Sequence, residues 1–578
     1  MFKIIQNFLN FCQPDNRRKF KVAVIYAVID SLFEAMKIGA IYLFVKTAFE
    51  GELSMKTAWM CLAIMIVSVV GSGLTKNKST ILQTDGGYST CALKRMEIAE
   101  HLRYVPMGYF NDNSLGQVIS IATNTMEMLE NLATRVIMMV TGGILKTLII
   151  TIAICIFDIR IGLILIVGLI VFKIANAGLV KYSGKIAKLK DKTDEALVEQ
   201  IVEYVEGISE VKSYKLTGEK CAHLNQTNED NANANIKMEC ILAPFMGIQT
   251  FIIKLLGVVV TFVSIYFYLN GSLSIVDCIM MIIASFIVYA NLELASSYSS
   301  LLRNVDICVK KAQAVMDSEQ MELEGVKEDP INFDIEVKNV SFSYEKKKII
   351  DNVSFKIPAK TTTAIVGPSG GGKTTLTSLI SRFWDVDEGS ITLGGRDIRE
   401  YNYDTLMKNF SFVFQRVYLF EDTIANNIRF GAPEASMAEV EAAAKKARCH
   451  EFIMSLPNGY ETVIGADGVN LSGGERQRIS IARAIMKDAP IIVLDEATAN
   501  VDPENENDLM NAISELTKDK TIIMIAHRLK TVEHADQILV VENGKIIERG
   551  KHEDLIKEDG LYKRFIEGRE KAVSWKIV

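Results

Sequence analysis

The chain has 578 residues, of which 49% are hydrophobic and 23% are charged, and its mean hydropathy is +0.19. This length exceeds what one hydrophobic core organises, so we expect at least two domains. The formal net charge of −6 gives no electrostatic reason to expect nucleic acid as a partner. The nine cysteines include no C-x-x-C pair and no zinc-ligand spacing, so a disulfide framework is not expected.

The N-terminal 12 residues place their apolar side chains near one face of a helix, and the basic run Arg17-Arg18-Lys19 follows. This pattern favours an interfacial helix over a signal peptide, since no small-residue cleavage site follows. Beyond it, six apolar stretches are long enough to cross a bilayer, so the lipid bilayer is an expected partner. They lie at about 22–48, 57–74, 136–157, 159–180, 241–269 and 273–297.

Lys and Arg are concentrated at the N-terminus and in two long connections, at about 75–135 and 181–240. The other connections between the apolar stretches are short. The positive-inside rule therefore places both termini and both long connections in the cytoplasm. Helical patterning within the long connections, as at 196–208, predicts that they are helices extended beyond the bilayer.

Several ionisable residues lie inside the predicted spans. Asp30, Glu34 and Lys37 share one face of the first span, Lys254 lies near the middle of the fifth, and Glu293 lies in the sixth. Each charge costs about 2.5–3.5 kcal/mol on insertion scales, so these side chains should face a cavity or a partner. Two interpretations stay open. The charges can form helix-packing ion pairs or reach the bilayer interface along their side chains, or they can line a polar translocation pathway, which is favoured for Lys254.

From Ile335 the chain has the short β-rich runs and glycine turns of a soluble α/β domain. The apolar run 363–366 precedes a match to the phosphate-loop pattern G-x-x-x-x-G-K-[ST], and a helix is expected at 376–383. Lys373 should reach the β- and γ-phosphates of a nucleotide, and Thr374 should hold Mg²⁺. The residues of this predicted ATP-binding loop are Gly367, Pro368, Ser369, Gly370, Gly371, Gly372, Lys373, Thr374 and Thr375.

A second apolar run, 491–494, ends in the acidic pair Asp495-Glu496. A central strand with this sequence would deliver both carboxylates to its C-terminal edge. There Asp495 would support Mg²⁺ and Glu496 would orient and polarise the attacking water. Two acids at a strand end can also form a helix cap or a turn, but the phosphate loop favours the catalytic interpretation.

The run Leu471-Ser472-Gly473-Gly474-Glu475 resembles the signature sequence of ATP-binding cassette proteins, in the variant with Glu at the fifth position. That resemblance implies that Ser472, Gly473 and Gly474 bind the γ-phosphate of an ATP molecule held by another subunit. The active unit would then be a dimer with two ATP molecules at its interface.

Four further residues resemble conserved positions of that family. Tyr344 resembles the aromatic residue that stacks on adenine, although a core aromatic is the ordinary alternative. Gln415 resembles the glutamine that senses Mg²⁺, and Asp502 lies in a run that resembles the loop crossing to the opposite site. His527 resembles the switch histidine that contacts the γ-phosphate, so the implied catalytic residues are Glu496, His527 and Lys373.

The preceding part of the chain resembles exporter-fold half-transporters. The implied fold is an all-α six-helix transmembrane domain with cytoplasmic helix extensions, followed by an α/β P-loop ATPase domain. One departure is the run 465–468, Gly-Ala-Asp-Gly, where many exporters have Gly-Glu-x-Gly. The expected parts are an N-terminal segment 1–20, a transmembrane domain 21–310, a linker 311–332, a nucleotide-binding domain 333–568 and a tail 569–578.

The resemblance implies an ATP-driven, multi-pass transporter of the cell membrane with its N-terminus and its nucleotide-binding domain in the cytoplasm. It would act as a dimer with an identical or a different half-transporter. The strings 102–110 and 499–504, with Glu475, resemble siderophore transporters, which suggests a ferric siderophore or metal chelate as the small-molecule substrate. The alternatives are a multidrug, lipid or peptide exporter, an ATP-gated channel and a soluble P-loop ATPase.

Overall fold

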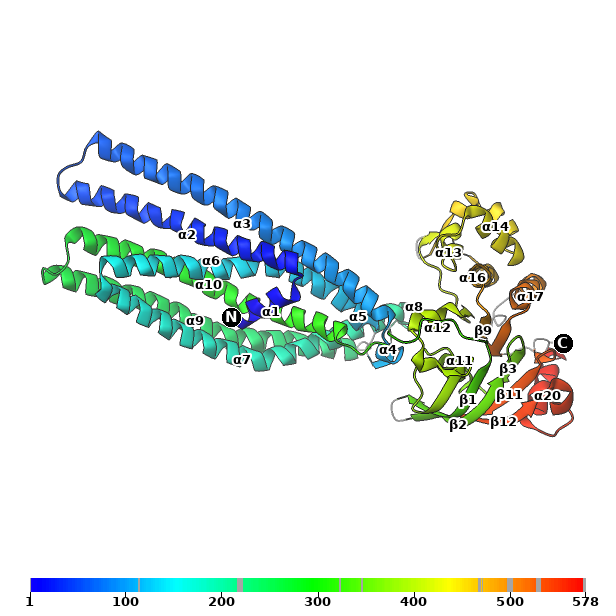
Figure 1. The fold of residues 1–578 in the computed structure, drawn as a ribbon. Coiled ribbons are helices and arrows are strands. Elements are labelled where there is room, and N and C mark those ends of the chain that lie inside the picture. Colours follow the sequence, from blue (N-terminus) through cyan, green and yellow to red (C-terminus); the bar gives the residue numbers. More distant parts are fainter. Residues whose placement is uncertain are drawn as a thin grey trace. The chain divides into compact units, whose positions relative to one another are not determined.

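The computed structural model describes residues 2–112, 115–215, 222–321, 324–344, 347–465, 469, 471–495, 503–525 and 532–574. Its helices and strands, which are labelled in Figure 1, form two compact units. The first unit comprises Met1–Arg103 and Asp112–Ser318, and the second comprises Tyr104–Asn111 and Glu319–Val578.

The first unit is helical. Its short helices are α1 (Phe2–Phe11), α5 (Leu115–Ser120), the π-helical turn η1 (Ile121–Thr125) and α8 (Ile208–Ser213). Its six long helices are α2 (Pro14–Phe49), α3 (Met55–Arg103), α6 (Met126–Phe157), α7 (Ile159–Glu206), α9 (Ala222–Leu269) and α10 (Ile275–Met316). The predicted extensions are confirmed as helices, since α3 and α7 run far past the apolar stretches 57–74 and 159–180. Helix α10 also enters the first part of the expected linker.

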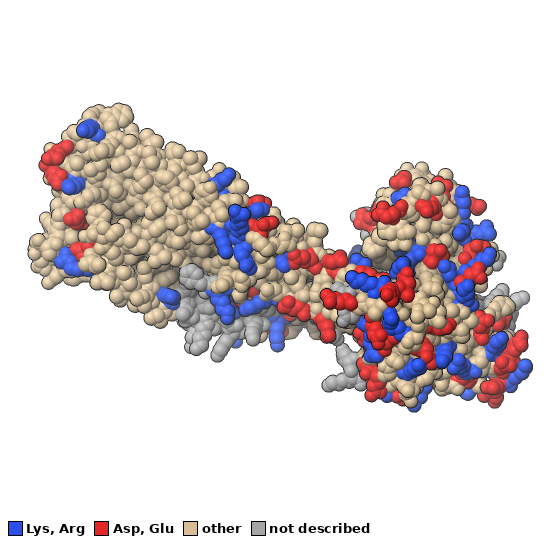
Figure 2. Space-filling view, viewed as in Figure 1, with Lys and Arg blue, Asp and Glu red and all other residues tan. Residues whose placement is uncertain are grey.

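By length and composition, four helical stretches of the described residues can cross a membrane, namely Met55–Arg103, Gly116–Phe157, Ala222–Leu269 and Ile275–Ala295. Helix α2 has the length for a further span but carries Asp30, Glu34 and Lys37 within its apolar stretch. Figure 2 shows long uncharged areas on the visible face of the helical unit, whereas the strand-containing unit is dotted with both signs of charge. These features fit a transmembrane domain and a water-exposed domain.

Small polar residues hold α2 and α3 together. Ser79 Oγ donates to the Ala23 carbonyl oxygen at 2.8 Å, and Ser68 Oγ donates to the Phe33 carbonyl oxygen at 2.5 Å. A Cβ added at Gly71 would lie 2.5 Å from the Phe33 ring, so the small residue allows the close approach. This use of serine and glycine is typical of helix packing in membranes.

Helix α1 forms as the amphipathic pattern predicts. Its residues Phe8 and Phe11 are buried in a cluster that also contains residues of α3, α6 and α10. The apolar face of α1 therefore packs into the helical unit.

The second unit contains the strands. They are β1 (Ile335–Tyr344), β2 (Lys347–Ile357), β3 (Thr362–Val366), β4 (Glu388–Leu393), β5 (Arg396–Asp397), β6 (Phe410–Val413), β7 (Asp422–Thr423), β8 (Val463–Ile464), β9 (Ile491–Asp495), β10 (Thr521–Ile525), β11 (Gln537–Glu542) and β12 (Lys545–Gly550). The larger sheet has the order β12-β11-β3-β10-β9-β6, in which β11 to β6 are parallel and β12 is antiparallel. A four-stranded antiparallel sheet has the order β2-β1-β4-β5, and β7 pairs with β8.

The second unit also contains helices. They are α11 (Lys373–Ile380), η3 (Ile398–Glu400), α12 (Tyr403–Lys408), α13 (Ile424–Arg429), α14 (Met437–Lys446), α15 (His450–Ser455), η4 (Gly459–Glu461), α16 (Gly473–Lys487), α17 (Pro503–Thr517), α19 (His552–Leu555) and α20 (Leu561–Ser574). Strand β10 is buried throughout, and its successive residues Ile522 and Ile523 enter two different hydrophobic cores. This burial on both faces explains why β3, β9 and β10 are continuous apolar runs.

The segment Tyr104–Asn111, which includes most of α4 (Gly108–Asp112), belongs to the second unit by its contacts. Its position in the sequence, inside the expected transmembrane domain 21–310, gave no indication of this. Since Tyr104 directly follows the last residue of α3, the segment is the covalent continuation of a long helix.

Candidate functional site

The predicted phosphate loop lies between β3 and α11, as its sequence requires. Gly367, Gly370 and Gly372 have φ angles of 149°, 77° and 106°, which favour glycine. A Cβ at Gly367 would lie 2.0 Å from the Val541 carbonyl oxygen of β11. The loop therefore follows a path that few other residues could take, and it leads into the N-terminus of α11, where backbone N–H groups are available to an anion.

Lys373 is the first residue of α11 and is buried. Its Nζ donates to the carbonyl oxygens of Gly367 at 3.1 Å and Pro368 at 2.9 Å. The amine therefore lies inside the turn of the loop, where phosphate oxygens could replace these acceptors. The next residue, Thr374, is exposed in the first turn of the helix.

The strand register brings three predicted parts of the site to one edge of the larger sheet, namely the phosphate loop, Asp495 and Gln415. Ile525 of β10 pairs with Ile365 of β3 on one side and with Asp495 of β9 on the other. Val413 of β6 pairs with Leu494, so Gln415 and Asp495 follow neighbouring strands. Parallel strands share the edge at which their carboxyl ends lie, so the phosphate loop, Asp495 and Gln415 meet on that edge.

The signature run forms the start of α16. Ser472 is the N-cap, and its Oγ accepts a hydrogen bond from the Glu475 backbone N–H at 3.3 Å. In return, Glu475 Oε2 accepts from the Ser472 N–H at 2.7 Å, which completes a capping box. Ser472 and Gly473 are exposed, so this helix N-terminus is accessible to an external anion.

Tyr344 is half-buried at the end of β1. Its ring packs edge-on against Phe342 at 4.9 Å and against Trp384 at 4.7 Å between centroids. Tyr344 thus belongs partly to an aromatic core while its remaining surface is open, so it can serve both as a core residue and as a platform for a base.

Four parts of the predicted site lie outside the described residues. They are Glu496, Asp502, His527 and the 466–468 portion of the departure before the signature. Their assignments remain predictions. Strand β9, which precedes Glu496, forms where the sequence predicts it, and β10 ends two residues before His527.

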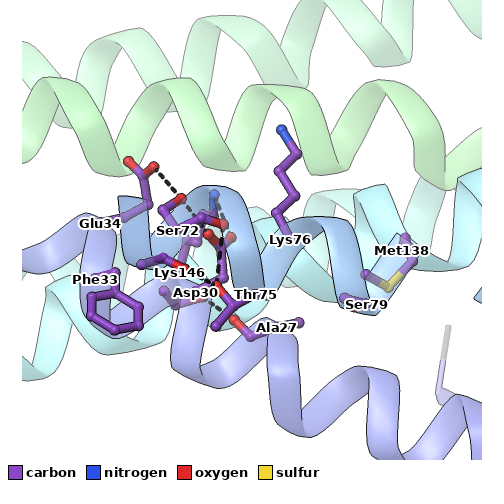
Figure 3. Close-up of polar contacts among 12 residues, drawn as sticks. Ala27, Asp30, Phe33, Glu34, Ser72, Thr75, Lys76, Ser79, Met138 and Lys146 are labelled. Atoms are coloured by element: carbon purple, nitrogen blue, oxygen red, sulfur yellow. Dashed lines mark hydrogen bonds and ion pairs between the residues drawn. The ribbon is translucent and has the colours of Figure 1, made fainter. Parts of the chain in front are cut away.

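The first-span charges form a polar cluster among α2, α3 and α6, drawn in Figure 3. Asp30 is buried, and its carboxylate pairs with Lys146 Nζ at 3.1 Å and accepts from Ser72 Oγ at 2.5 Å. Glu34 contacts Ser72 Oγ at 3.1 Å and Lys37 Nζ at 2.8 Å. Glu34 and Lys37 thus pair within α2, whereas the cation that faces Asp30 comes from another helix.

The remaining candidate pathway residues, Lys254 on α9 and Glu293 on α10, are exposed. Sequence reasoning missed Lys146 and Ser72. The available signal was that Lys146 is a cation inside the apolar stretch 136–157, although nothing in the sequence pairs it with Asp30. Lys76 lies one turn from Ser72 on α3, and Figure 3 shows its amine pointing away from Asp30.

Two family models match the chain. The model of the ABC transporter transmembrane region matches residues 4–291, and the ABC transporter model matches residues 350–499. The first match covers most of the helical unit. The second includes the phosphate loop, the signature run and Asp495.

Relatives that match most of the chain agree with these two family models. An ATP-dependent lipid A-core flippase of Haemophilus influenzae (strain ATCC 51907 / DSM 11121 / KW20 / Rd) is 30% identical over 95% of this chain and 94% of its own length. A Bacillus subtilis protein named for multidrug export is 34% identical over 81% of this chain and 82% of its own length. The structure of a bacterial Atm1-family ABC exporter with ATP bound matches 97% of this chain and 99% of its own with a TM-score of 0.87 and 26% identity.

The fold, the phosphate loop and the signature helix thus agree with similarity along nearly the full length of both halves. The chain therefore belongs to the ABC transporter family, whose membrane-spanning members couple ATP hydrolysis in a cytoplasmic domain to transport.

Proposed function

We propose that this transporter exports an amphipathic, lipid-like or drug-like molecule and works as a dimer of two half-transporters. The observation that carries the proposal is the similarity along 95% of the chain to a lipid A-core flippase, since it includes the membrane helices that would contact the substrate. Relatives named for flipping and export favour the export alternative over ferric-siderophore uptake. An ATP-gated channel without pumping lacks such support.

ATP would bind with its phosphates in the loop 367–375, where Lys373 would exchange its carbonyl acceptors for phosphate oxygens. Thr374, Gln415 and Asp495 offer the oxygen ligands that Mg²⁺ prefers, and Gln415 and Asp495 follow adjacent strands. We assign these residues to Mg²⁺, which would neutralise phosphate charge during hydrolysis.

The remaining residues of the ATP site are assigned roles from their positions in the sequence. Glu496 directly follows Asp495 and is assigned to orient and polarise the attacking water. His527, two residues beyond β10, is assigned to the γ-phosphate. Asp502 is assigned to the loop that crosses to the opposite site, and Tyr344 to the adenine base.

A dimer is proposed because the signature helix exposes Ser472 and Gly473, and the nucleotide it would hold belongs to the other subunit. An exposed aromatic patch supports a protein contact on the same domain. Tyr418 packs on Phe420 at 5.1 Å and Phe420 on Phe430 at 4.7 Å, yet these side chains are 73%, 50% and 52% exposed.

The amphipathic substrate class agrees with the membrane helices. Their long apolar surfaces suit acyl chains or ring systems, and the polar cluster of Asp30, Glu34, Lys37, Ser72 and Lys146 could face a polar headgroup.

Complementation tests the shared ATP sites. Lys373→Ala and Ser472→Ala should each abolish ATPase activity, because each removes one half of both sites in a dimer. Co-expressed, the two variants form mixed dimers in which one site is intact and the other is doubly defective. We expect activity up to about a quarter of the wild-type value from random pairing. Activity no higher than in either variant alone would contradict shared sites.

The substrate class is tested with the purified chain in liposomes. With ATP, the protein should move a nitrobenzoxadiazole-labelled phospholipid or an amphipathic dye between leaflets, as measured by quenching with dithionite. Glu496→Gln, which retains the loop, is the matched control. ATP-dependent movement of a ferric siderophore without movement of either amphipathic probe would overturn the proposed substrate class.

A further inference from the structure

Hydrogen bonds hold the segment Tyr104–Asn111 in place within the second unit, the ATPase domain. The Met107 N–H donates to the Phe383 carbonyl oxygen at 3.1 Å, and the Met321 N–H donates to the Tyr104 carbonyl oxygen at 2.8 Å. Tyr104 Oη also donates to Asp404 Oδ2 at 3.0 Å. A segment that continues α3 thus has a defined position against the residues that follow α11.

Gly108 and Trp384 are in close contact within this arrangement. A Cβ added at Gly108 would lie 2.7 Å from the Trp384 ring, with two more ring atoms at 3.2 and 3.3 Å. Real Cβ atoms do not approach other atoms so closely, so any side chain at 108 must displace the ring. The absence of a side chain at Gly108 therefore sets where the indole lies.

The same indole also packs against the residue assigned to adenine. Trp384 and Tyr344 lie 4.7 Å apart between centroids with a 78° interplanar angle, and Phe342 packs on Trp384 at 5.5 Å and 69°. Edge-to-face pairs depend on both distance and angle. A shift of the indole would therefore change the preferred orientation of the Tyr344 ring.

We propose that Trp384 is a positioning residue that links the Tyr104–Asn111 segment to Tyr344, so that movement of the membrane helix α3 changes the affinity for the adenine base. This inference rests on the proposed role of Tyr344. It adds a contact route from the transport domain to the base, separate from the roles assigned to Gln415 at Mg²⁺ and to His527 at the γ-phosphate. The alternative is that Trp384 only fills a core, and that role would affect stability without a selective effect on nucleotide binding.

Gly108→Ala is the sharpest test, because it moves the indole without touching the phosphate loop. We expect the KM for ATP to rise roughly two- to tenfold, the effect of losing one aromatic pair contact, with kcat almost unchanged. Gly116→Ala is the matched control, since nothing lies within 4 Å of a Cβ at that position. Equal KM values in Gly108→Ala, Gly116→Ala and the wild type would overturn the proposal.

The fluorescence of Trp384 gives a second readout. If Trp384 only filled a core, its emission would not depend on the adenine base. The chain has three tryptophans, and Trp59→Phe with Trp575→Phe leaves only Trp384. In this background the Trp384 emission should shift on addition of ATP and shift less with inorganic tripolyphosphate, which has no base. Gly108→Ala should alter the ATP response. Identical responses to ATP and tripolyphosphate would contradict a link to the base.

Two variants separate failure of this link from failure of the Tyr344 assignment. Tyr344→Ala should raise the KM for ATP at least as much as Gly108→Ala. An unchanged KM in Tyr344→Ala would refute the adenine assignment on which the link rests. A raised KM in Tyr344→Ala, with unchanged values in Gly108→Ala and Trp384→Ala, would refute the link alone.

Discussion

Glu475 is the acidic fifth residue of the signature run, and its contacts explain why an acid is tolerated there. Its carboxylate closes the capping box with Ser472, and an acid in the first turn of α16 also favours the helix dipole. The same bond holds the backbone of the exposed serine that we assign to the opposite ATP. Glu475 therefore contributes both to the stability of α16 and to the position of the serine assigned to ATP.

We predict that Glu475→Ala lowers the free energy of unfolding by about 1 kcal/mol, because the Ser472 N–H loses its partner. ATPase activity should fall as well, since Ser472 becomes less ordered. Glu475→Gln should retain both properties, because an amide oxygen can accept the same bond. Thermal denaturation and phosphate release measure the two effects; full activity in Glu475→Ala would show that the box is dispensable for function.

Asp30 and Lys146 form the other informative pair, because the carboxylate is buried while its cation comes from a different helix. Lys146→Met would leave the Asp30 carboxylate without a cation, at a cost of roughly 3 kcal/mol. The double variant Asp30→Asn with Lys146→Met should be more stable than Lys146→Met alone. Melting temperatures in detergent give the ranking.

Lys37→Met is the comparison for that pair. The Lys37–Glu34 contact is more exposed, with side chains 33% and 31% accessible, so its loss should cost about 1 kcal/mol or less. A double variant less stable than Lys146→Met would mean that Asp30 does not depend on Lys146.

The sequence indicated some of these residues and could not indicate others. Lys373, Asp495 and Ser472 stand in local motifs whose spacing is fixed by one loop, one strand end and one helix start. The contacts of Lys146 with Asp30 and of Gly108 with Trp384 join segments far apart in the chain. No local pattern specifies such a pair, since it depends on how the helices and loops pack.

The connection of β3, the phosphate loop and α11 packs tightly against β11. Gly367 faces the Val541 carbonyl oxygen, whereas nothing lies within 4 Å of a Cβ at Gly370, although both have positive φ angles. Alanine substitutions at the two glycines can therefore separate the cost of a steric clash from the cost of an unfavourable backbone conformation.

We expect Gly370→Ala to cost about 1–2 kcal/mol for its left-handed backbone. Gly367→Ala should cost more, by about 1–3 kcal/mol, because the neighbouring strand or the loop must also move. Denaturation of the full chain and binding of a fluorescent ATP analogue measure both. Equal losses in the two variants would indicate that the contact with Val541 is not constraining.

Element prediction succeeded where a periodic or continuous apolar pattern marked the element. The expected runs 363–366 and 491–494 lie in β3 and β9, and the helical pattern at 196–208 lies mostly in α7. The docking of Tyr104–Asn111 was not predictable, because this short segment has no periodicity and its partners, such as Asp404, are 300 residues away. The four-residue departure at 465–468 stays open, since most of it lies outside the described residues.

The two units divide the work as their composition predicts, with apolar helices in one and the nucleotide motifs in the other. Transport requires that ATP binding and hydrolysis shift the membrane helices between states, which demands a difference in affinity between those states. Among the described residues, the Tyr104–Asn111 segment continues α3 and belongs to the second unit by its contacts, so it can carry part of that difference. A dimer with shared ATP sites would supply the closing force.

The most direct measurement follows an amphipathic dye and a labelled ferric siderophore in inside-out membrane vesicles that contain the protein, with Glu496→Gln as the inactive control. ATP-driven export in the cell predicts accumulation of the dye in the vesicle lumen with the wild type, and none with Glu496→Gln. ATP-dependent loss of preloaded siderophore from the lumen, without dye accumulation, would contradict export and indicate uptake.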